Sequence, residues 1–248
     1  MNEKFLVIDT ETTNSLDDPI CYDIGFAVVD KEGNVYETHS YAIADIILDS
    51  ELMNTAYYAE KLPSYWTEIE NGERKLRKFR TVKCIVADII KQYNIKIVVA
   101  HNARFDYKSL NLTSRFITSS RFRYFFPFGV KIWDTLKMSR EVLKGSDSYR
   151  KFCIDNGYIT KNKQNRFTAE VLYRYLTNDT SFIEAHRGLQ DVLIEKDIFA
   201  YCMKEYPEIN GALWGDKSHK ANKKIFQKPI DKQKKIMYNK DTIKQGGN

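Results

Sequence analysis

The segment FLVIDTETT, residues Phe5–Thr13, is the part of the sequence around which the expected fold is organised. Side chains alternate between the two faces of a strand, so Asp9 and Glu11 project from the same side. The residues before Asp9 are apolar on both faces, which predicts a central strand covered on its two sides. Two carboxylates at the end of a buried strand repel each other, and a hard divalent cation would relieve that repulsion. By itself, an Asp-x-Glu pair is more often a solvated strand end.

Length and composition bound the class of protein. The chain has 248 residues, of which 43% are hydrophobic, enough for one domain with a sizeable core. No apolar run approaches the roughly 20 residues of a membrane helix, and the short run after Glu3 is not a signal peptide. The four cysteines are far apart, without a CxxC pair. Reduced thiols in the cytoplasm are therefore expected, with no membrane partner.

The positive charge is concentrated at the end of the chain. The formal net charge is +6, and the stretch from Asp216 to the C-terminus holds ten lysines and only three aspartates. We divide the chain into a folded domain, residues 1–213, and a basic C-terminal tail, residues 214–248. The tail is either a solvated, flexible end or an arm that binds phosphates or a protein partner.

The remaining pattern predicts an α/β layered domain. Two further strands are expected at residues 22–30 and 35–44, joined by the turn signal of Lys31–Asn34. An amphipathic helix at Val82–Tyr93 and strands at Lys96–Ala100 and Val130–Leu136 follow, each strand leading into a helix. We therefore expect a central mixed five-stranded sheet flanked by helices. The basic run Arg74–Arg80 is interpreted as a solvated charged segment or, less favoured, as a rim that contacts a nucleic-acid strand.

Acidic side chains recur at the ends of the predicted elements. Asp106 follows the strand at Lys96–Ala100, with Asn102 as the expected helix N-cap, and Asp191 lies five residues after His186 on the last long helix. Periodicity alone would place Asp191 in water, because it lies off the apolar stripe that includes Leu189, Val192, Leu193, Phe199, Ala200 and Met203. If the ends of neighbouring central strands open onto one crevice, four carboxylates meet there. Two Mg²⁺ or Mn²⁺ ions about 4 Å apart would fit such ligands and support in-line attack on a phosphodiester.

Three motifs in order give the chain a resemblance to a known family. The chain resembles the DEDDh 3′–5′ exonucleases, the DnaQ-like or RNase T-like group on an RNase H-like fold, from Lys4 to Lys204. The motifs are D-x-E-T-T at Asp9–Thr13, H-N-A-x-F-D at His101–Asp106 and H-x4-D at His186–Asp191. Arg187 stands where a Tyr-type relative carries tyrosine, which favours the His-type subclass. Asn14 departs from the glycine found there in many relatives.

The resemblance implies a set of metal ligands. Asp9 would contact both metal ions, and Glu11 and Asp191 would complete the shell of the first. Asp106 would act near the second ion, partly through water. The implied cofactors are two divalent cations, Mg²⁺ or Mn²⁺.

The resemblance also implies a catalytic base and contacts to the substrate. His186 would take a proton from the attacking water, a role that suits an imidazole whose pKa is near neutrality. Thr12 and Thr13 would face the 3′-terminal nucleotide, with Asn102 as a further substrate-binding residue. His101 is interpreted as structural or as a support for the metal ligands.

The expected activity is that of a metal-dependent 3′–5′ exonuclease that releases nucleoside 5′-monophosphates. Single-stranded DNA is the first expected substrate and partner, and RNA is possible because no residue visibly reads a 2′-hydroxyl. The basic and aromatic residues between Arg121 and Lys131 could hold the strand by charge and stacking, or belong to the core. The alternatives are an RNA or oligoribonucleotide exonuclease, a polymerase proofreading subunit, and a non-hydrolytic nucleic-acid- or partner-binding protein on the same fold.

Overall fold

The fold is built on one mixed sheet. The computed structural model describes residues 3–56, 58–119 and 123–205, so the basic tail at residues 214–248 lies outside the described part. The sheet has six strands in the order β4-β3-β2-β1-β5-β6. Strand β1 (Phe5–Thr13) lies inside it, pairing antiparallel with β2 (Ile20–Val29) and parallel with β5 (Ile97–Ala100). The predicted central strand is therefore confirmed.

The outer strands extend the sheet in both directions. Strand β3 (Val35–Ile43) continues the antiparallel meander beside β2, and β6 (Lys131–Asp134) runs parallel to β5. The predicted number of five strands is wrong, because Lys75–Arg77 forms a sixth strand, β4, parallel to β3. These three residues lie in the basic run that was expected to be solvated. An edge strand of three residues with exposed charged side chains is too short to show a periodic pattern in the sequence. It is recognised as a strand only by its pairing with β3.

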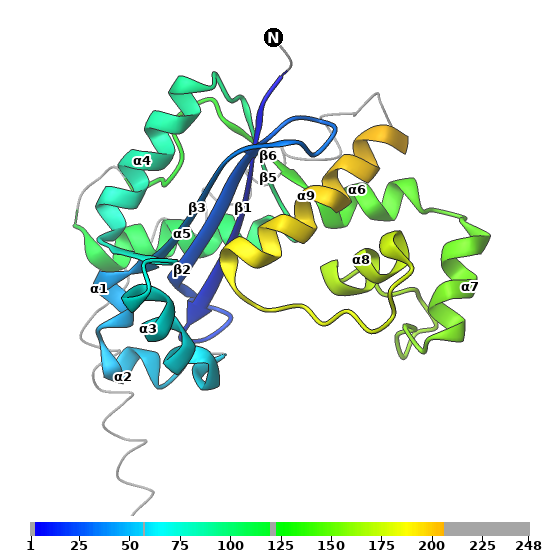
Figure 1. The fold of residues 1–248 in the computed structure, drawn as a ribbon, viewed down its shortest axis with the longest axis horizontal. Coiled ribbons are helices and arrows are strands. Elements are labelled where there is room, and N and C mark those ends of the chain that lie inside the picture. Colours follow the sequence, from blue (N-terminus) through cyan, green and yellow to red (C-terminus); the bar gives the residue numbers. More distant parts are fainter. Residues whose placement is uncertain (1–2, 57, 120–122, 206–248) are drawn as a thin grey trace, which may run out of the picture.

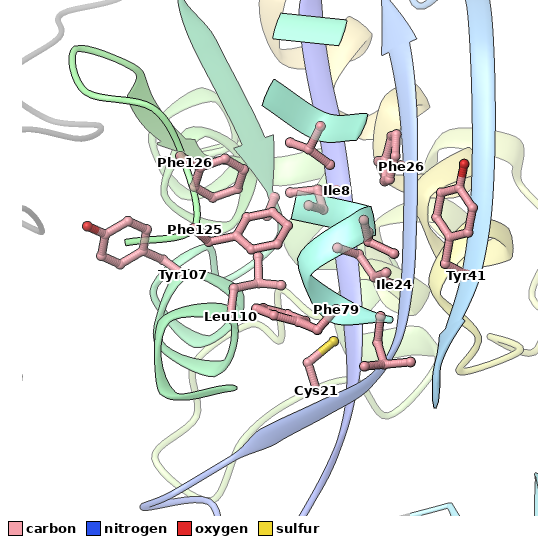
Figure 2. Packing of buried hydrophobic residues seen from close by; sticks show 14 of the residues in the cluster. Ile8, Cys21, Ile24, Phe26, Tyr41, Phe79, Tyr107, Leu110, Phe125 and Phe126 are labelled. Carbon is pink, nitrogen blue, oxygen red and sulfur yellow. The ribbon is translucent and has the colours of Figure 1, made fainter. Parts of the chain in front are cut away.

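Helices cover both faces of the sheet (Figure 1). One face is covered by α4 (Phe79–Gln92) and α5 (Arg104–Ile117), whose side chains pack with Leu6 and Ile8 of β1. Figure 2 shows this core, in which Phe125 and Phe126 are buried, so these two aromatic residues belong to the core. The other face is covered by four helices, which pack on Phe5 and Val7: α6 (Thr135–Val142), α7 (Asp147–Asp155), α8 (Ala169–Thr177) and α9 (Gly188–Glu205).

Short helices fill the connection between β3 and β4. They are α1 (Ala44–Ile47), α2 (Ser50–Met53), the 3₁₀ helix η1 (Ala59–Lys61) and α3 (Leu62–Glu70). Tyr65 of α3 is fully buried. Within the described ranges, no helix is both long and apolar enough to cross a membrane.

The last helix, α9, lies across β1 and β2 (Figure 1). The apolar stripe predicted for it is wrong in part, since Leu193 is 38% exposed whereas Asp191 and Glu195 are buried. The buried face combines these acids with Val192, Ile194, Ile198, Phe199 and Cys202. A prediction from the spacing of apolar residues assumes that the buried face of a helix is apolar. Here the first turns of α9 face the carboxylates of the site instead.

Candidate active site

Asp9 and Glu11 lie inside β1 rather than beyond its end, opposite Gly25 and Asp23 of β2. The pairing of β1 with β2 shifts register between Glu11 and Thr12. Such an irregularity bends a strand and redirects its side chains. Both acids share the strand face of Phe5 and Val7, so they point towards the α9 side of the sheet.

Asp106 reaches the site from the other side of β1. It lies in the first turn of α5, just beyond β5, and its Oδ1 accepts hydrogen bonds from the Thr10 backbone N–H at 3.1 Å and from the Thr10 hydroxyl at 2.8 Å. The predicted N-cap is wrong, because α5 begins at Arg104 after Ala103 and no side chain caps it. Asn102 is exposed, has a φ of 60°, and donates its backbone N–H to Asp134 Oδ1 at 3.0 Å.

A contact between two glycines brings the third motif to β1. A Cβ atom on Gly25 would lie 2.0 Å from the Leu189 nitrogen, and one on Gly188 would lie 2.5 Å from the Gly25 nitrogen. The N-terminus of α9 therefore touches the backbone of β2 directly opposite Asp9. The Gly188 N–H donates to Asp23 Oδ2 at 3.1 Å, which fixes the end of the helix.

Among the described residues, Glu11, His186 and Asp191 form a group of potential metal ligands. Each offers one ligand atom, and these atoms all lie within 4.8 Å of one another. Asp191 is buried, and its Oδ2 accepts the Arg187 backbone N–H at 2.7 Å. The structure thus brings together the first and third motifs as the sequence predicts.

The carboxylates strongly perturb one another. Burial, followed by the charges of Glu195, Asp106, Glu11 and Asp191, raises the pKa of Asp9 well above its ordinary value. Burial, followed by the charge of Asp191, raises the pKa of Glu11 to about 9. Burial is also the main reason why the pKa values of Asp106 and Asp191 are each raised to about 7. Oxygen donors that repel one another in this way suit hard divalent cations, so the residues present fit the implied cofactors.

His186 is half-buried and has a φ of 51°, in the left-handed region. Burial, followed by the positive charge of Lys61, lowers the pKa of its imidazole. Both effects favour the neutral ring, which is the form that can accept a proton.

Glu195 is a member of the site that the sequence reading missed. It is 3% exposed, lies one helical turn after Asp191, and accepts the His101 backbone N–H through Oε2 at 3.3 Å. Its charge is the largest electrostatic contribution from a neighbouring group to the pKa of Asp9. A four-residue spacing from Asp191 was the available signal, because it places both acids on one helix face.

The residues predicted to contact the nucleotide differ in exposure: Thr12 and Thr13 are buried, whereas Asn102 is exposed. Thr12 and Thr13 are both buried, and the Thr13 hydroxyl donates to the Leu52 carbonyl, so it holds α2 against β1. Asn14 has a φ of 72°, a conformation that asparagine and glycine tolerate best, which explains how it replaces glycine there.

Both ring nitrogens of His101 are hydrogen-bonded within the protein, which indicates a structural role. It is half-buried, with its Nδ1 2.9 Å from the Thr135 hydroxyl and its Nε2 2.8 Å from the Phe167 carbonyl. Burial lowers its pKa, and the carbonyl requires that Nε2 carry the proton. The ring therefore ties the segment before α8 to the end of β5.

Comparisons with known proteins place the fold. No family model matches the chain, and no curated protein matches it. Among solved structures, the nuclease domain of 3′hExo, described as a DEDDh family member bound to rAMP, matches with a TM-score of 0.60 and 13% identity over 84% of this chain and 96% of that one. E. coli exonuclease I in complex with a dA16 oligonucleotide matches with a TM-score of 0.51 and 16% identity, over 83% of this chain but only 42% of that one.

A third match is exonuclease X in complex with 5′ overhanging duplex DNA, with a TM-score of 0.48 and 17% identity over 86% of this chain and 99% of that one. The first two matches establish the fold alone. The described residues adopt the fold of the nuclease domain of 3′hExo, which is described as a DEDDh family member.

Proposed function

We propose that this protein is a metal-dependent 3′–5′ exonuclease that removes nucleoside 5′-monophosphates from single-stranded DNA. The observation that carries the proposal is the convergence of Asp9, Glu11, Asp106, Asp191 and His186 around one end of β1. A protein that only binds nucleic acid has no need to bury mutually repelling carboxylates. Burying these carboxylates lowers the stability of the fold, and a catalytic role explains why they are buried.

His186 is the proposed general base. Its ring lies beside Glu11 and Asp191, and burial together with the charge of Lys61 lowers its pKa, which favours the neutral form. A neutral imidazole at this position takes the proton of the attacking water as the water oxygen bonds to phosphorus. The bond from phosphorus to the 3′ oxygen of the preceding nucleotide breaks, and that oxygen takes a proton from solvent to become the new 3′-hydroxyl. Asp9, Glu11, Asp106 and Asp191 would hold the cations, which supply Lewis-acid activation and neutralise charge on the phosphodiester.

The polymer is proposed to be single-stranded DNA, with RNA as the close alternative. One matching structure holds a dA16 oligonucleotide and another holds rAMP, so the two neighbours differ in sugar. The released product is proposed to be a nucleoside 5′-monophosphate in either case.

The central test uses 5′-labelled single-stranded DNA, duplex DNA and RNA with Mg²⁺, Mn²⁺ or EDTA. A ladder that shortens from the 3′ end with metal, and is absent with EDTA, is the expected result. Asp9→Asn removes one carboxylate charge with little change in volume. It should therefore lower the rate of degradation at least about 10²-fold while the protein stays folded. Full activity of Asp9→Asn would overturn the metal assignment.

The basic tail is proposed to strengthen binding of the polymer by charge. Truncation after Gly215 removes ten lysines. Titrations of fluorescent DNA at several salt concentrations should then give weaker binding and a smaller dependence of log K on log salt. An unchanged salt dependence would contradict this role, and retained folding of the truncated chain is the required control.

A further inference from the structure

One helical stripe faces the turn that carries His186. Tyr58 directly precedes η1, and Lys61, Tyr65 and Glu68 follow Tyr58 at three- or four-residue spacing along η1 and α3, with Ser64 beside them. Residues at this spacing lie on the same side of a helix. Each of the five contacts the Ala185–Gly188 turn or a residue that holds it, as described below. We call these five residues the α3 stripe.

The contacts begin at the imidazole. The ring of Tyr58 stacks on the ring of His186, with centroids 4.3 Å apart and an angle of 11° between the planes. Lys61 donates from Nζ to the Ala185 carbonyl and lies 4.7 Å from the centroid of the Tyr58 ring. The stripe therefore grips both the side chain of His186 and the backbone immediately before it.

The next contacts hold the backbone after His186. Arg187 pairs with Glu68 and donates to the Ser64 hydroxyl at 2.6 Å. Glu68 also binds Arg74 at 2.8 Å, and Arg74 pairs with the fully buried Asp23.

Asp23 connects this network to the sheet and to α9. It accepts the Tyr65 hydroxyl at 2.8 Å and the Gly188 N–H at 3.1 Å. The turn is thus fastened to β2 on one side and to α3 on the other.

The number of contacts explains an unusual backbone. The φ of 51° at His186 is unfavourable for a residue with a side chain, and such conformations persist where the surroundings determine them. A free imidazole would also rotate about its side-chain bonds, and an aromatic ring stacked nearly parallel to it restricts that rotation. The α3 stripe supplies both restraints.

We infer that Tyr58 and Lys61 are positioning residues that align the His186 ring for proton transfer, Tyr58 by stacking and Lys61 by anchoring the Ala185 carbonyl. The inference rests on the proposed exonuclease activity. It goes beyond it because neither residue belongs to the three motifs. Alignment matters because misplacement of a reacting group by about 1 Å can lower a rate about 100-fold.

The test measures kcat and KM of the full chain on single-stranded DNA. Tyr58→Ala and Lys61→Met should each lower kcat about 10-fold or more with KM changed less than about twofold. Tyr58→Phe keeps the stacked ring and Lys61→Arg keeps a cationic donor, so both should recover most of kcat. The matched controls are Trp66→Ala, on α3 but outside the stripe, and Lys91→Met on α4, and they should leave both constants unchanged.

A second measurement does not depend on activity. Hydrogen exchange of the metal-free protein should speed up about 10-fold or more at the Arg187 and Gly188 amides in Lys61→Met, while exchange in β1 stays unchanged. Circular dichroism and thermal unfolding identify any variant that fails to fold, and Tyr58→Phe and Lys61→Arg keep the inference testable in that case.

The outcomes separate the inference from the proposed function. If wild-type protein shows no metal-dependent degradation, the proposed function fails, and the exchange result still reports whether the stripe holds the turn. If wild-type protein is active and the two disruptive variants keep their kcat, the positioning role is wrong. A rise in KM alone would also overturn it, because Tyr58 and Lys61 would then bind the strand instead.

Discussion

At His186, backbone conformation and proposed chemistry meet in one residue. Its φ of 51° is one of six positive values among the described residues other than glycine, and the other five belong to asparagine or lysine. A strained residue of this kind costs about 1–3 kcal/mol and is common at functional sites. The strain is consistent with a side chain that must point in one direction.

The pH dependence of the rate should reflect the protonation of His186. Only neutral His186 accepts a proton, so kcat should fall as pH drops through its pKa, which lies below the ordinary value of about 6.5 because burial and Lys61 lower it. His186→Ala should lower kcat about 10²- to 10⁴-fold, keep DNA binding, and lose the acid limb of the profile. His39→Gln on β3 is the matched control; a retained acid limb in His186→Ala would assign the titration to another group.

Individual residues differ in how well the sequence predicts them. Asp9, Glu11, Asp106, Asp191 and His186 were named from motifs, and the structure brings Glu11, His186 and Asp191 together. Glu195 was missed because a glutamate on a helix is usually solvated. Its burial is understood only when it is seen as one member of the carboxylate cluster. The contacts of the α3 stripe with Ala185, His186 and Arg187 were also missed, since they join residues more than 110 positions apart.

At the scale of elements, strands and helices with strong periodicity were predicted well. The predicted strand that ends at Asp9 and Glu11 lies within β1, which is longer than predicted. Helix α4 and strands β5 and β6 agree with their predicted ranges within a few residues, because their apolar faces are continuous. Strand β4 was not predicted, because three residues carry too little pattern. The buried face of α9 was predicted incorrectly because its position is set by a backbone contact that leaves no apolar signature.

That contact gives a prediction about Gly25. Gly25→Ala places a Cβ atom 2.1 Å from the Gly188 carbonyl carbon, and backbone cannot move aside as a flexible side chain does. We expect α9 to shift away from β2, a loss of about 1–3 kcal/mol in the free energy of unfolding and a loss of kcat of at least about 10-fold. Urea unfolding and steady-state kinetics measure the two effects.

The control for this substitution is Gly129→Ala. Gly129 has a φ of 88° and nothing within 4 Å of an added Cβ atom, so it introduces backbone strain without overlap. It should lose about 1 kcal/mol of stability and keep its activity. Equal kinetic losses in the two variants would show that general destabilisation, not displacement of α9, explains the effect at Gly25.

At the scale of the whole molecule, the buried acids make stability depend on pH and on metal. Their pKa values are raised in the folded state, to about 9 for Glu11 and about 7 for Asp106 and Asp191, from about 4 in the unfolded chain. The folded protein therefore binds more protons between these values, and stability must decrease as pH rises from about 4 to about 9.

The expected result is a metal-free protein that is more stable at pH 5 than at pH 8.5, by at least about 2 kcal/mol in urea unfolding with EDTA. Mn²⁺ at 100 times its dissociation constant should restore about 2.7 kcal/mol at pH 8.5. Glu195→Gln keeps an acceptor for the His101 N–H and removes one acid, so it should reduce the pH dependence. Stability that is independent of pH, with or without metal, would mean that these carboxylates do not repel one another as described.

The contact between Gly25 and Gly188 also determines when the site can exist. Residues of β2 and α9 that meet there are separated by more than 160 positions, so the ribosome makes Asp9, Glu11 and Asp106 long before His186 and Asp191. A nascent chain that ends before residue 185 has the acids of β1 and α5 but no base and no final ligand. The enzyme proposed here would thus remain inactive during most of its own synthesis, and chains that terminate early would not degrade nucleic acid.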